Sequence, residues 1–257
     1  MTVEEILKVD HIVQKYQAHN GEIIAIEDIS FSVKEGEFVS IVGPSGCGKS
    51  TLLSIISGLL TPTYGEILVN GEKTRGISPK IAYMLQKDNL LEWRTIYKNI
   101  LLGLEIRGTL TRETEEYAVS LLKTYGLHEF KDKHPSQLSG GMRQRAALIR
   151  TLATKPDIFL LDEAFSALDY QTRLKVTDDV YSILKKENKT TLMVTHDIPE
   201  SISMSDRIIV LTSRPAKIRE IHKIDFEMPE RTPLKCRQHP AFSGYFNMIW
   251  RELDEPG

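Results

Sequence analysis

The sequence is poor in cysteine, in long apolar runs and in excess positive charge, and each shortage excludes a class of protein. Its 257 residues include two cysteines, Cys47 and Cys236, too few for a disulfide framework or a cysteine-based zinc site. No stretch approaches the roughly 18 consecutive apolar residues that span a membrane. Its 33 Lys and Arg residues stand against 35 Asp and Glu residues, a net charge of −2. A general nucleic-acid binder usually carries a basic excess, so we expect no nucleic-acid partner.

The rest of the composition is that of an ordinary globular chain. Hydrophobic residues make up 41% and charged residues 26% of the sequence, enough apolar material for one large domain or two small ones. The opening MTVEEILKVDH carries acids where a signal peptide has a basic segment followed by an apolar one. We therefore expect a cytosolic setting.

The first part of the chain predicts strands, a loop and a helix. Residues 6–14, 22–26 and 29–33 are rich in β-branched side chains and predict an N-terminal β region. Phe38–Val42 is a short apolar run typical of a buried parallel strand. A glycine-rich stretch follows, and then a predicted helix over residues 50–60.

The second part predicts an α/β core with a helical segment inserted in it. The pattern turns helical over residues 87–137, and strands return at 158–161, 191–194 and 208–211. The tail after Ser213 contains Pro215, Pro229, Pro233 and Pro240, which predict an irregular connection. It ends in a predicted helix whose apolar stripe is expected to pack on the core. That stripe consists of Phe242, Phe246, Ile249 and Leu253.

A glycine-rich motif between the strand 38–42 and the helix 50–60 points to a nucleotide site. It matches G-x-x-x-x-G-K-[ST] and consists of Gly43, Pro44, Ser45, Gly46, Cys47, Gly48, Lys49 and Ser50. Its glycines free backbone N–H groups to converge on phosphate oxygens, at the positive end of the following helix. Lys49 is expected to reach the β- and γ-phosphates, and the Ser50 hydroxyl to hold Mg²⁺. The alternative is a glycine-rich turn with an incidental lysine. Kinases, GTPases and motors share the motif, so it indicates a nucleoside triphosphate and no more.

Two adjacent acids, Asp162 and Glu163, follow the apolar run 158–161. Ligand sites in open parallel sheets lie beyond the carboxyl ends of the strands, so these acids are expected to face the phosphate loop. Asp162 is then a candidate Mg²⁺ ligand, and Glu163 a candidate general base for the water that attacks the γ-phosphorus. The alternative is that both acids merely solvate a strand end.

A second glycine loop, formed by Ser139, Gly140 and Gly141, opens another predicted helix. An N-cap role accounts for Ser139. The two glycines weaken a helix start unless something must approach the backbone closely, and an anion at the helix N-terminus is the natural candidate. Capping alone is the alternative.

Four motifs, read in order, resemble one family. GPSGCGKST, LSGGMRQR, IFLLDEAFSALD and VTHD resemble the ATP-binding subunits of ABC transporters, and LSGGMRQR is similar to that family's signature motif. The resemblance covers nearly the whole chain. Within the family, SGGMRQR, NLLEWRTIYKNI and the tail LTSRPAKIREIHKIDF are similar to the nitrate/sulfonate/taurine-type importers.

The resemblance implies a fold and its division along the chain. The implied fold is an α/β P-loop NTPase core of the ABC-type ATPase, with an N-terminal antiparallel β region and an inserted helical subdomain. Residues 1–257 then form a single ABC ATPase domain. Within it, 1–86 and 156–212 make the nucleotide-binding core, 87–155 the helical insert with the signature helix, and 213–257 a C-terminal tail.

The resemblance also implies roles for individual residues, with ATP and Mg²⁺ as ligands. Thr51 completes the phosphate loop. Tyr16 matches the aromatic that stacks on adenine, although by itself it is a half-buried tyrosine at a strand end. Gln86 matches the glutamine that meets Mg²⁺ and the attacking water. His196 matches the histidine at the γ-phosphate, with strand capping as its alternative.

The implied partners are a second copy of the chain and a membrane permease. The copies are expected head to tail, with the 139–141 loop of each completing the other's nucleotide site and Asp169 in a loop that pairs across the dimer. The segment with Leu90, Leu91 and Trp93 resembles the groove for the permease's coupling helix; a hydrophobic cluster under a loop is the alternative. A solute-binding protein is an indirect partner. The implied location is peripheral, at the cytoplasmic face of the membrane.

Two positions depart from the family pattern, and two rival functions stand beside this one. Ala164 replaces the usual proline after the acids, which is expected to loosen the loop that carries Glu163. Glu92 replaces a proline common in the subfamily.

The main rival is a soluble ABC-type ATPase acting on DNA or ribosomes, expected to carry a second nucleotide domain, a coiled-coil insert or a basic surface. A P-loop kinase is the third candidate, which the signature motif and Glu163 oppose.

Overall fold

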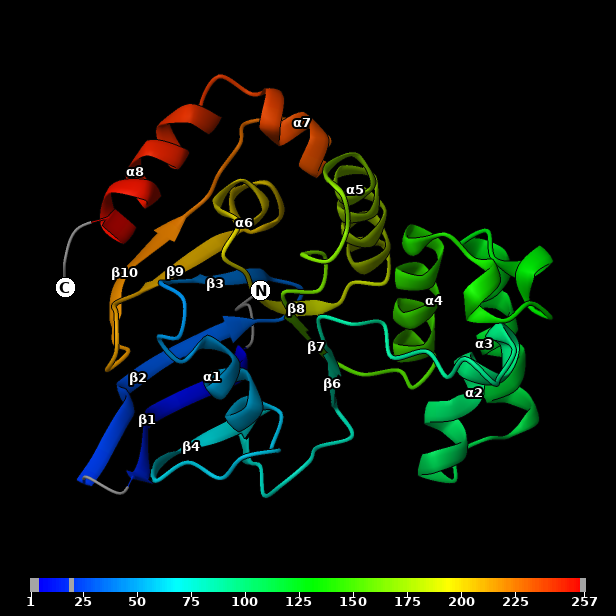
Figure 1. Ribbon diagram of the computed structural model, residues 1–257, viewed down its shortest axis with the longest axis horizontal. Coiled ribbons are helices and arrows are strands. Elements are labelled where there is room, and N and C mark those ends of the chain that lie inside the picture. The colour runs from blue at the N-terminus through cyan, green and yellow to red at the C-terminus, as the bar shows by residue number, and fades with distance from the viewer. Residues whose placement is uncertain (1–4, 19–20, 255–257) are drawn as a thin grey trace.

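The computed structural model describes residues 5–18 and 21–254 of the chain, and its strands form two sheets (Figure 1). An antiparallel sheet has the order β2–β1–β4–β5, with β1 Glu5–Ala18, β2 Gly21–Lys34, β4 Tyr64–Val69 and β5 Glu72–Lys73. The larger sheet has the order β10–β9–β3–β8–β7–β6. Its strands are β3 Phe38–Val42, β6 Ile81–Met84, β7 Ile158–Asp162, β8 Thr190–Val194, β9 Arg207–Leu211 and β10 Ile218–Lys223. All of them but β10 run parallel to their neighbours.

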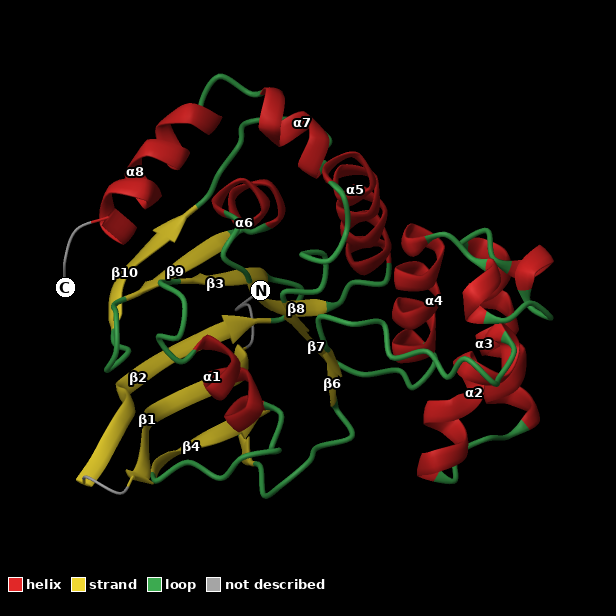
Figure 2. Ribbon diagram, in the orientation of Figure 1, coloured by secondary structure: helices red, strands yellow, loops and turns green. Residues whose placement is uncertain are grey.

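The helices gather in separate groups around these sheets (Figure 2). Their bounds are α1 Lys49–Ile56, α2 Ile96–Arg107, α3 Arg112–Thr124, α4 Gly140–Leu152, α5 Tyr170–Lys186, α6 Ile198–Met204, α7 Pro233–Gln238 and α8 Phe242–Asp254. Helices α2, α3 and α4 lie together at one end of the molecule, and α7 and α8 lie beyond α6. Among the described residues, we find no helix with the length and apolar character needed to cross a membrane.

Three buried clusters hold these groups together. Helix α1 packs between the two sheets, since Leu52 and Ile56 share a cluster with Leu7 and Val39. The inserted helices α2–α4 pack with α5 and the opposite face of the large sheet. Helices α6 and α8 pack on β9, and the predicted stripe of α8 lies in this third cluster. The α/β core, the N-terminal antiparallel region and the helical insertion are thus as predicted.

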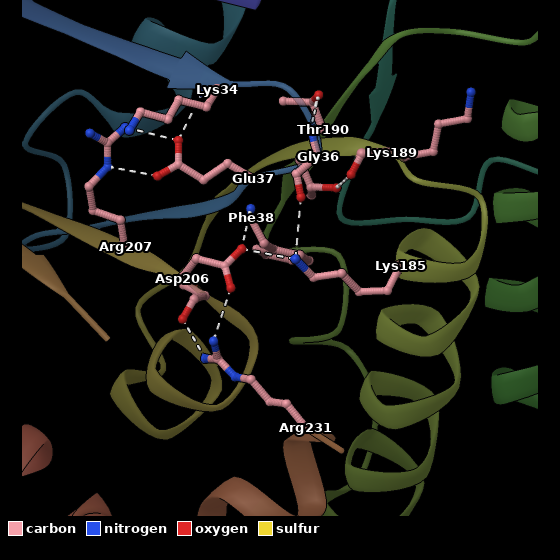
Figure 3. Close-up of polar contacts among 12 residues, drawn as sticks. Lys34, Gly36, Glu37, Phe38, Lys185, Lys189, Thr190, Asp206, Arg207 and Arg231 are labelled. Carbon is pink, nitrogen blue, oxygen red and sulfur yellow. Dashed lines mark hydrogen bonds and ion pairs between the residues drawn. The ribbon is translucent and has the colours of Figure 1, made fainter. Parts of the chain in front are cut away.

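The C-terminal tail is anchored at the end of β3 remote from the phosphate loop (Figure 3). There Asp206 accepts hydrogen bonds from the Phe38 backbone N–H at 2.9 Å, from Lys185 Nζ at 2.9 Å and from Arg231 Nη1 at 3.0 Å. Because Lys185 lies in the last turn of α5 and Arg231 belongs to the tail, one carboxylate joins a strand, a helix and the tail.

The structure corrects several predicted elements. The strands predicted at 22–26 and 29–33 are one strand, β2, which passes through Asp28 with φ 54° as an irregularity rather than a break. The helix predicted over 50–60 ends at Ile56. The tail begins with an irregular connection as predicted, but a strand that was not predicted follows it: β10 forms because β9 offers an edge on which it pairs antiparallel.

Candidate active site

The phosphate loop connects β3 to α1, as its motif predicts. All five residues of β3 are buried. Gly46 and Gly48 have φ of 73° and 126°, values that a side chain would strain, so both glycines are needed for the loop's shape. Lys49 lies buried over the loop and donates hydrogen bonds to the carbonyls of Gly43 at 2.8 Å and Pro44 at 2.9 Å. These two hydrogen bonds therefore hold the ammonium group of Lys49 against the backbone of the phosphate loop.

The first of the two acids lies against the start of α1. The Ser50 hydroxyl donates to Asp162 Oδ1 at 3.1 Å, which unites two candidate Mg²⁺ ligands that are far apart in the sequence. Tyr83 from β6 donates its hydroxyl to the other oxygen, Asp162 Oδ2, at 2.8 Å. Burial, and next the Asp162 carboxylate, raise the pKa of Tyr83 well above its usual value, so it remains a donor. Tyr83 is a site residue that the local sequence pattern does not reveal.

The second acid, Glu163, is held by several hydrogen bonds. Its φ is 46°, a left-handed conformation that costs a non-glycine residue about 1–3 kcal/mol. Its backbone N–H donates to the Val194 carbonyl at 2.9 Å, and its own carbonyl accepts from the Ser166 hydroxyl at 3.0 Å. Ala164, where a proline is usual, is buried beside it. These contacts fix the turn that carries the Glu163 side chain.

The other two candidate catalytic residues lie next to this turn. His196 Nδ1 lies 3.1 Å from Glu163 Oε1. Gln86 Nε2 donates to Ser166 Oγ at 2.8 Å, and Ser166 in turn binds the Glu163 carbonyl. Residues from three strand ends are thereby connected around Glu163.

The 139–141 loop has contacts that do not involve the phosphate loop. Ser139 caps α4 by accepting from the Met142 backbone N–H at 3.3 Å, as predicted. A Cβ on Gly141 would lie 2.9 Å from Val176 Cγ2 of α5, and one on Gly140 would lie 3.2 Å from Leu168 Cδ2. The close approach expected at these glycines is thus made, within this chain, by apolar side chains.

Ser139, Gly140, Gly141 and Asp169 line one pocket of about 890 Å³. Residues 43–51 are not among its lining residues. In Figure 1, α4 also lies apart from α1, on the side of the inserted helices. The candidate site residues therefore fall into two separate groups. Asp169 itself caps α5 by accepting from the Thr172 N–H at 3.1 Å.

Tyr16 lies near the end of β1, paired with Ile23 of β2, and is 41% exposed. This exposure agrees with either interpretation of Tyr16, as an adenine-stacking ring or as a half-buried strand-end residue. Two residues after Ile23, β2 lies close to the phosphate loop: the Ala25 carbonyl would lie 3.2 Å from a Cβ on Gly48. Strand β2 therefore joins the Tyr16 region to the phosphate loop.

The segment after Gln86 is tied to helix α4. Arg143 binds Asp88 at 2.9 Å and Glu92 at 3.0 Å, and Arg150 donates to the Asp88 backbone carbonyl at 2.7 Å. Leu90 belongs to the buried cluster of the insert, whereas Trp93 is 76% exposed. Of the segment predicted to receive the coupling helix, Leu90 is therefore part of the hydrophobic core and Trp93 lies on the surface.

The comparisons with known proteins agree with this geometry. A family model described as ABC transporter matches residues 26–166. An uncharacterized ABC transporter ATP-binding protein of Bacillus subtilis, YtlC, is 47% identical, covering 96% of this chain and 95% of the relative. The taurine import ATP-binding protein TauB of Roseobacter denitrificans is 36% identical, covering 97% and 96%.

Solved structures are similar over most of the fold. The dimeric structure of MJ0796, a bacterial ABC transporter cassette, has a TM-score of 0.71 and 34% identity, covering 86% of this chain and 99% of that one. A post-hydrolysis state of the same cassette, bound to ADP and Pi, has a TM-score of 0.70 and 33% identity with the same coverage. With its family model matched over more than half its length and relatives matched over nearly all of it, this chain belongs to the ATP-binding subunits of ABC transporters, a family of ATPases.

Proposed function

We propose that two copies of this chain, associated head to tail, hydrolyse ATP to drive solute import of the nitrate/sulfonate/taurine type through a separate membrane permease. The observation that carries the proposal is the separation of the site residues into two groups: residues 43–51 with Asp162 and Glu163, and the 139–141 loop with Asp169. Each group supplies part of what phosphoryl transfer needs, and a second copy supplies the rest. The taurine import relative, at 36% identity, supports the substrate class.

The nucleotide binds along the phosphate loop in this proposal. Backbone N–H groups of the phosphate loop surround the α- and β-phosphates, and Lys49 supplies its charge to the β- and γ-phosphates. Tyr16 stacks on the adenine. Base stacking on an aromatic ring contributes about 1–3 kcal/mol in nucleic-acid systems.

Mg²⁺ fits the residues beside the loop. Ser50 and Asp162 offer adjacent oxygen atoms, and Mg²⁺ is usually held by one or two carboxylates together with phosphates and water. Within the described part of the chain, no three His, Cys, Asp or Glu side chains gather to hold a metal by themselves, which suits an ion shared with the nucleotide. When bound, the ion neutralises phosphate charge. In this proposal Gln86 also contacts Mg²⁺ and the attacking water.

Glu163 is the general base and His196 contacts the γ-phosphate. The 3.1 Å contact between them keeps both side chains on the same side of the strand ends. Glu163 takes the proton of the water that attacks the γ-phosphorus, and ADP leaves. Ser139, Gly140, Gly141 and Asp169 of the partner subunit complete the site.

The permease contacts an exposed apolar region of the insert. Trp93 is 76% and Ile106 77% exposed. A pocket of about 340 Å³ nearby in the fold is lined by Ile77, Tyr83 and Ile106, and Tyr83 also binds Asp162. A coupling helix bound in this pocket contacts Tyr83, and Tyr83 binds the candidate metal ligand Asp162. The proposed location is therefore peripheral, at the cytoplasmic face of the membrane, with the solute-binding protein as an indirect partner.

Replacement of the general base tests the paired mechanism. Glu163→Gln is expected to bind ATP, to lose hydrolysis by about 10²–10⁴-fold, and to elute at twice the mass of one chain when ATP and Mg²⁺ are present. Size-exclusion chromatography with light scattering measures the mass. Glu113→Gln, the same change on the exposed start of α3, is the control. Near-normal turnover would remove Glu163 from its role, and a monomer at saturating ATP, alone and with the permease, would refute the paired site.

Trp93→Ala tests the permease contact. It is expected to leave basal ATPase activity unchanged and to reduce co-sedimentation with membranes that contain the permease, because the exposed ring is lost. Tyr64→Ala, which removes an exposed aromatic from β4, is the control. If Trp93→Ala sediments as the unaltered chain does and supports equal transport at matched expression, this surface does not bind the permease.

A further inference from the structure

The turn between β9 and β10, residues 212–217, lies against the phosphate loop. It is closed by hydrogen bonds from the Thr212 N–H to the Lys217 carbonyl and from the Lys217 N–H to Thr212 Oγ1, both 3.0 Å. Ala216 is also bonded to β2, donating to the Ala25 carbonyl at 3.0 Å and accepting from the Glu27 N–H at 2.9 Å. Both sheets therefore hold this turn in place.

Residues of β9 and the turn touch the loop at both of its ends. A Cβ on Gly43 would lie 3.1 Å from Leu211 Cβ, and one on Gly48 would lie 3.8 Å from Ala216 Cβ. Between these points, Arg214 Nη2 donates to the Gly46 carbonyl at 3.1 Å. Arg214 is the charged side chain that the tail places on the loop. Its charge, with that of Lys49, opposes the rise that burial causes in the pKa of Cys47.

The Gly46 carbonyl matters because of the peptide it belongs to. A trans peptide is planar, so the Gly46 C=O and the Cys47 N–H point in opposite directions. The Cys47 N–H donates a hydrogen bond to the Pro44 carbonyl at 3.3 Å, and Lys49 Nζ donates to the same carbonyl. Gly46 has a φ of 73°, in a region where glycine moves freely between conformations. A donor on its carbonyl therefore selects the peptide orientation in which the Cys47 N–H closes the turn on Pro44.

We infer that Arg214 is a positioning residue for the nucleotide: it fixes the Gly46–Cys47 peptide in the turn that shapes the phosphate loop, and it adds positive charge beside the loop. The inference rests on the proposed function, since it assigns a tail residue to the same ATP site. Its effect falls on nucleotide affinity, because within the described residues Arg214 bonds to the phosphate loop, whereas the candidate base Glu163 and the candidate metal ligands have other partners.

The test compares Arg214→Ala and Arg214→Lys with Lys217→Ala. The control removes the same charge from the same turn, where Lys217 pairs at 3.2 Å with Glu27 on the exposed surface. Affinity for fluorescent ATP and ADP is measured with and without Mg²⁺, together with KM and kcat. Arg214→Ala is expected to weaken both nucleotides and raise KM about tenfold, with kcat changed less than about twofold, since a hydrogen bond from a charged group is lost. Arg214→Lys should recover part of the affinity, and Lys217→Ala should keep it.

The opposite results are equally distinct. If Arg214→Ala binds ATP within twofold of the unaltered chain, or if Lys217→Ala loses as much, the assignment of Arg214 is wrong. Loss of ATP binding by the unaltered chain would instead refute the proposed function. Thermal melting checks the fold, and Arg214→Gln, which keeps a donor without the charge, replaces Arg214→Ala in the comparison if the alanine variant melts early.

Discussion

The two glycine loops of this chain both stand at the start of a helix, but their glycines differ in backbone conformation and in contacts. In the phosphate loop, Gly46 and Gly48 have positive φ. The neighbouring contacts are polar, since Lys49 binds a loop carbonyl and Ser50 binds a carboxylate. At the start of α4, by contrast, Gly140 and Gly141 lie in an ordinary helix and contact apolar side chains. The first pair serves backbone shape, and in the second pair Gly141 serves close packing on α5.

The surroundings of the two loops differ in the same way. The phosphate-loop residue Ser50 binds Asp162, and a histidine and a glutamine from neighbouring strand ends of the same chain lie around the turn of the next acid, Glu163. The 139–141 loop opens on a pocket shared with Asp169 and the face of α5. Under the proposed function, one chain provides the residues that react with ATP, and its 139–141 loop completes the site of a second copy. The proposed pairing rests on this difference between the two loops.

The largest predicted effect comes from blocking the second loop. Ser139→Arg is expected to leave ATP binding by one chain unchanged and to reduce hydrolysis on the order of 10²-fold or more, because it removes a donor and fills the partner's site. Binding is measured by titration with fluorescent ATP, and hydrolysis by phosphate release. Ser120→Arg, the same change on the exposed face of α3, is expected to leave both ATP binding and hydrolysis unchanged. If Ser139→Arg lost ATP binding by a single chain, this loop would belong to its own chain's site and the comparison would fail.

A smaller effect is predicted on the phosphate-loop side. Tyr83→Phe removes the hydroxyl that binds Asp162 and is expected to raise the Mg²⁺ concentration needed for half-maximal activity about threefold to tenfold. Binding of Mn²⁺ in the presence of ATP, followed by electron paramagnetic resonance, gives a second readout that does not depend on turnover. Tyr97→Phe, which removes a hydroxyl bonded to Glu115 on the insert, is the matched control. An unchanged metal requirement would show that Asp162 needs no support from β6.

Local patterns predict the parts of the site that follow one another along the chain. The phosphate loop needs only the strand before it and the helix after it, and Asp162 and Glu163 need only the apolar run of β7. Tyr83 and Arg214 are different, since each acts on a partner far away in sequence. A tyrosine on a strand and an arginine before a proline carry no local mark of those contacts, so neither is predicted.

The same distinction applies to the fold. Strand β10 is rich in charged side chains and forms because β9 presents an edge for pairing, which no local preference reports. Helix α5 goes unpredicted although Val176, Val180 and Leu184 recur at helical spacing and are buried. Its importance becomes clear only in space, where Val176 meets Gly141 and explains one of the two glycines.

That contact provides the smallest predicted effect, which tests whether the second loop's glycines serve packing. Gly141→Ala places a methyl group 2.9 Å from Val176 Cγ2, and overpacking of about 1–3 kcal/mol outweighs the gain in helix propensity of about 1 kcal/mol. Thermal and urea unfolding should show a net loss of about 1 kcal/mol. Gly140→Ala, which meets only the flexible end of Leu168 at 3.2 Å, should be near neutral. Adding Val176→Ala to Gly141→Ala should relieve the crowding, so that the two changes cost less together than their separate effects would sum to. If Gly141→Ala instead stabilised the chain, packing on α5 would not account for this glycine, and a ligand approaching the backbone would be left as its reason.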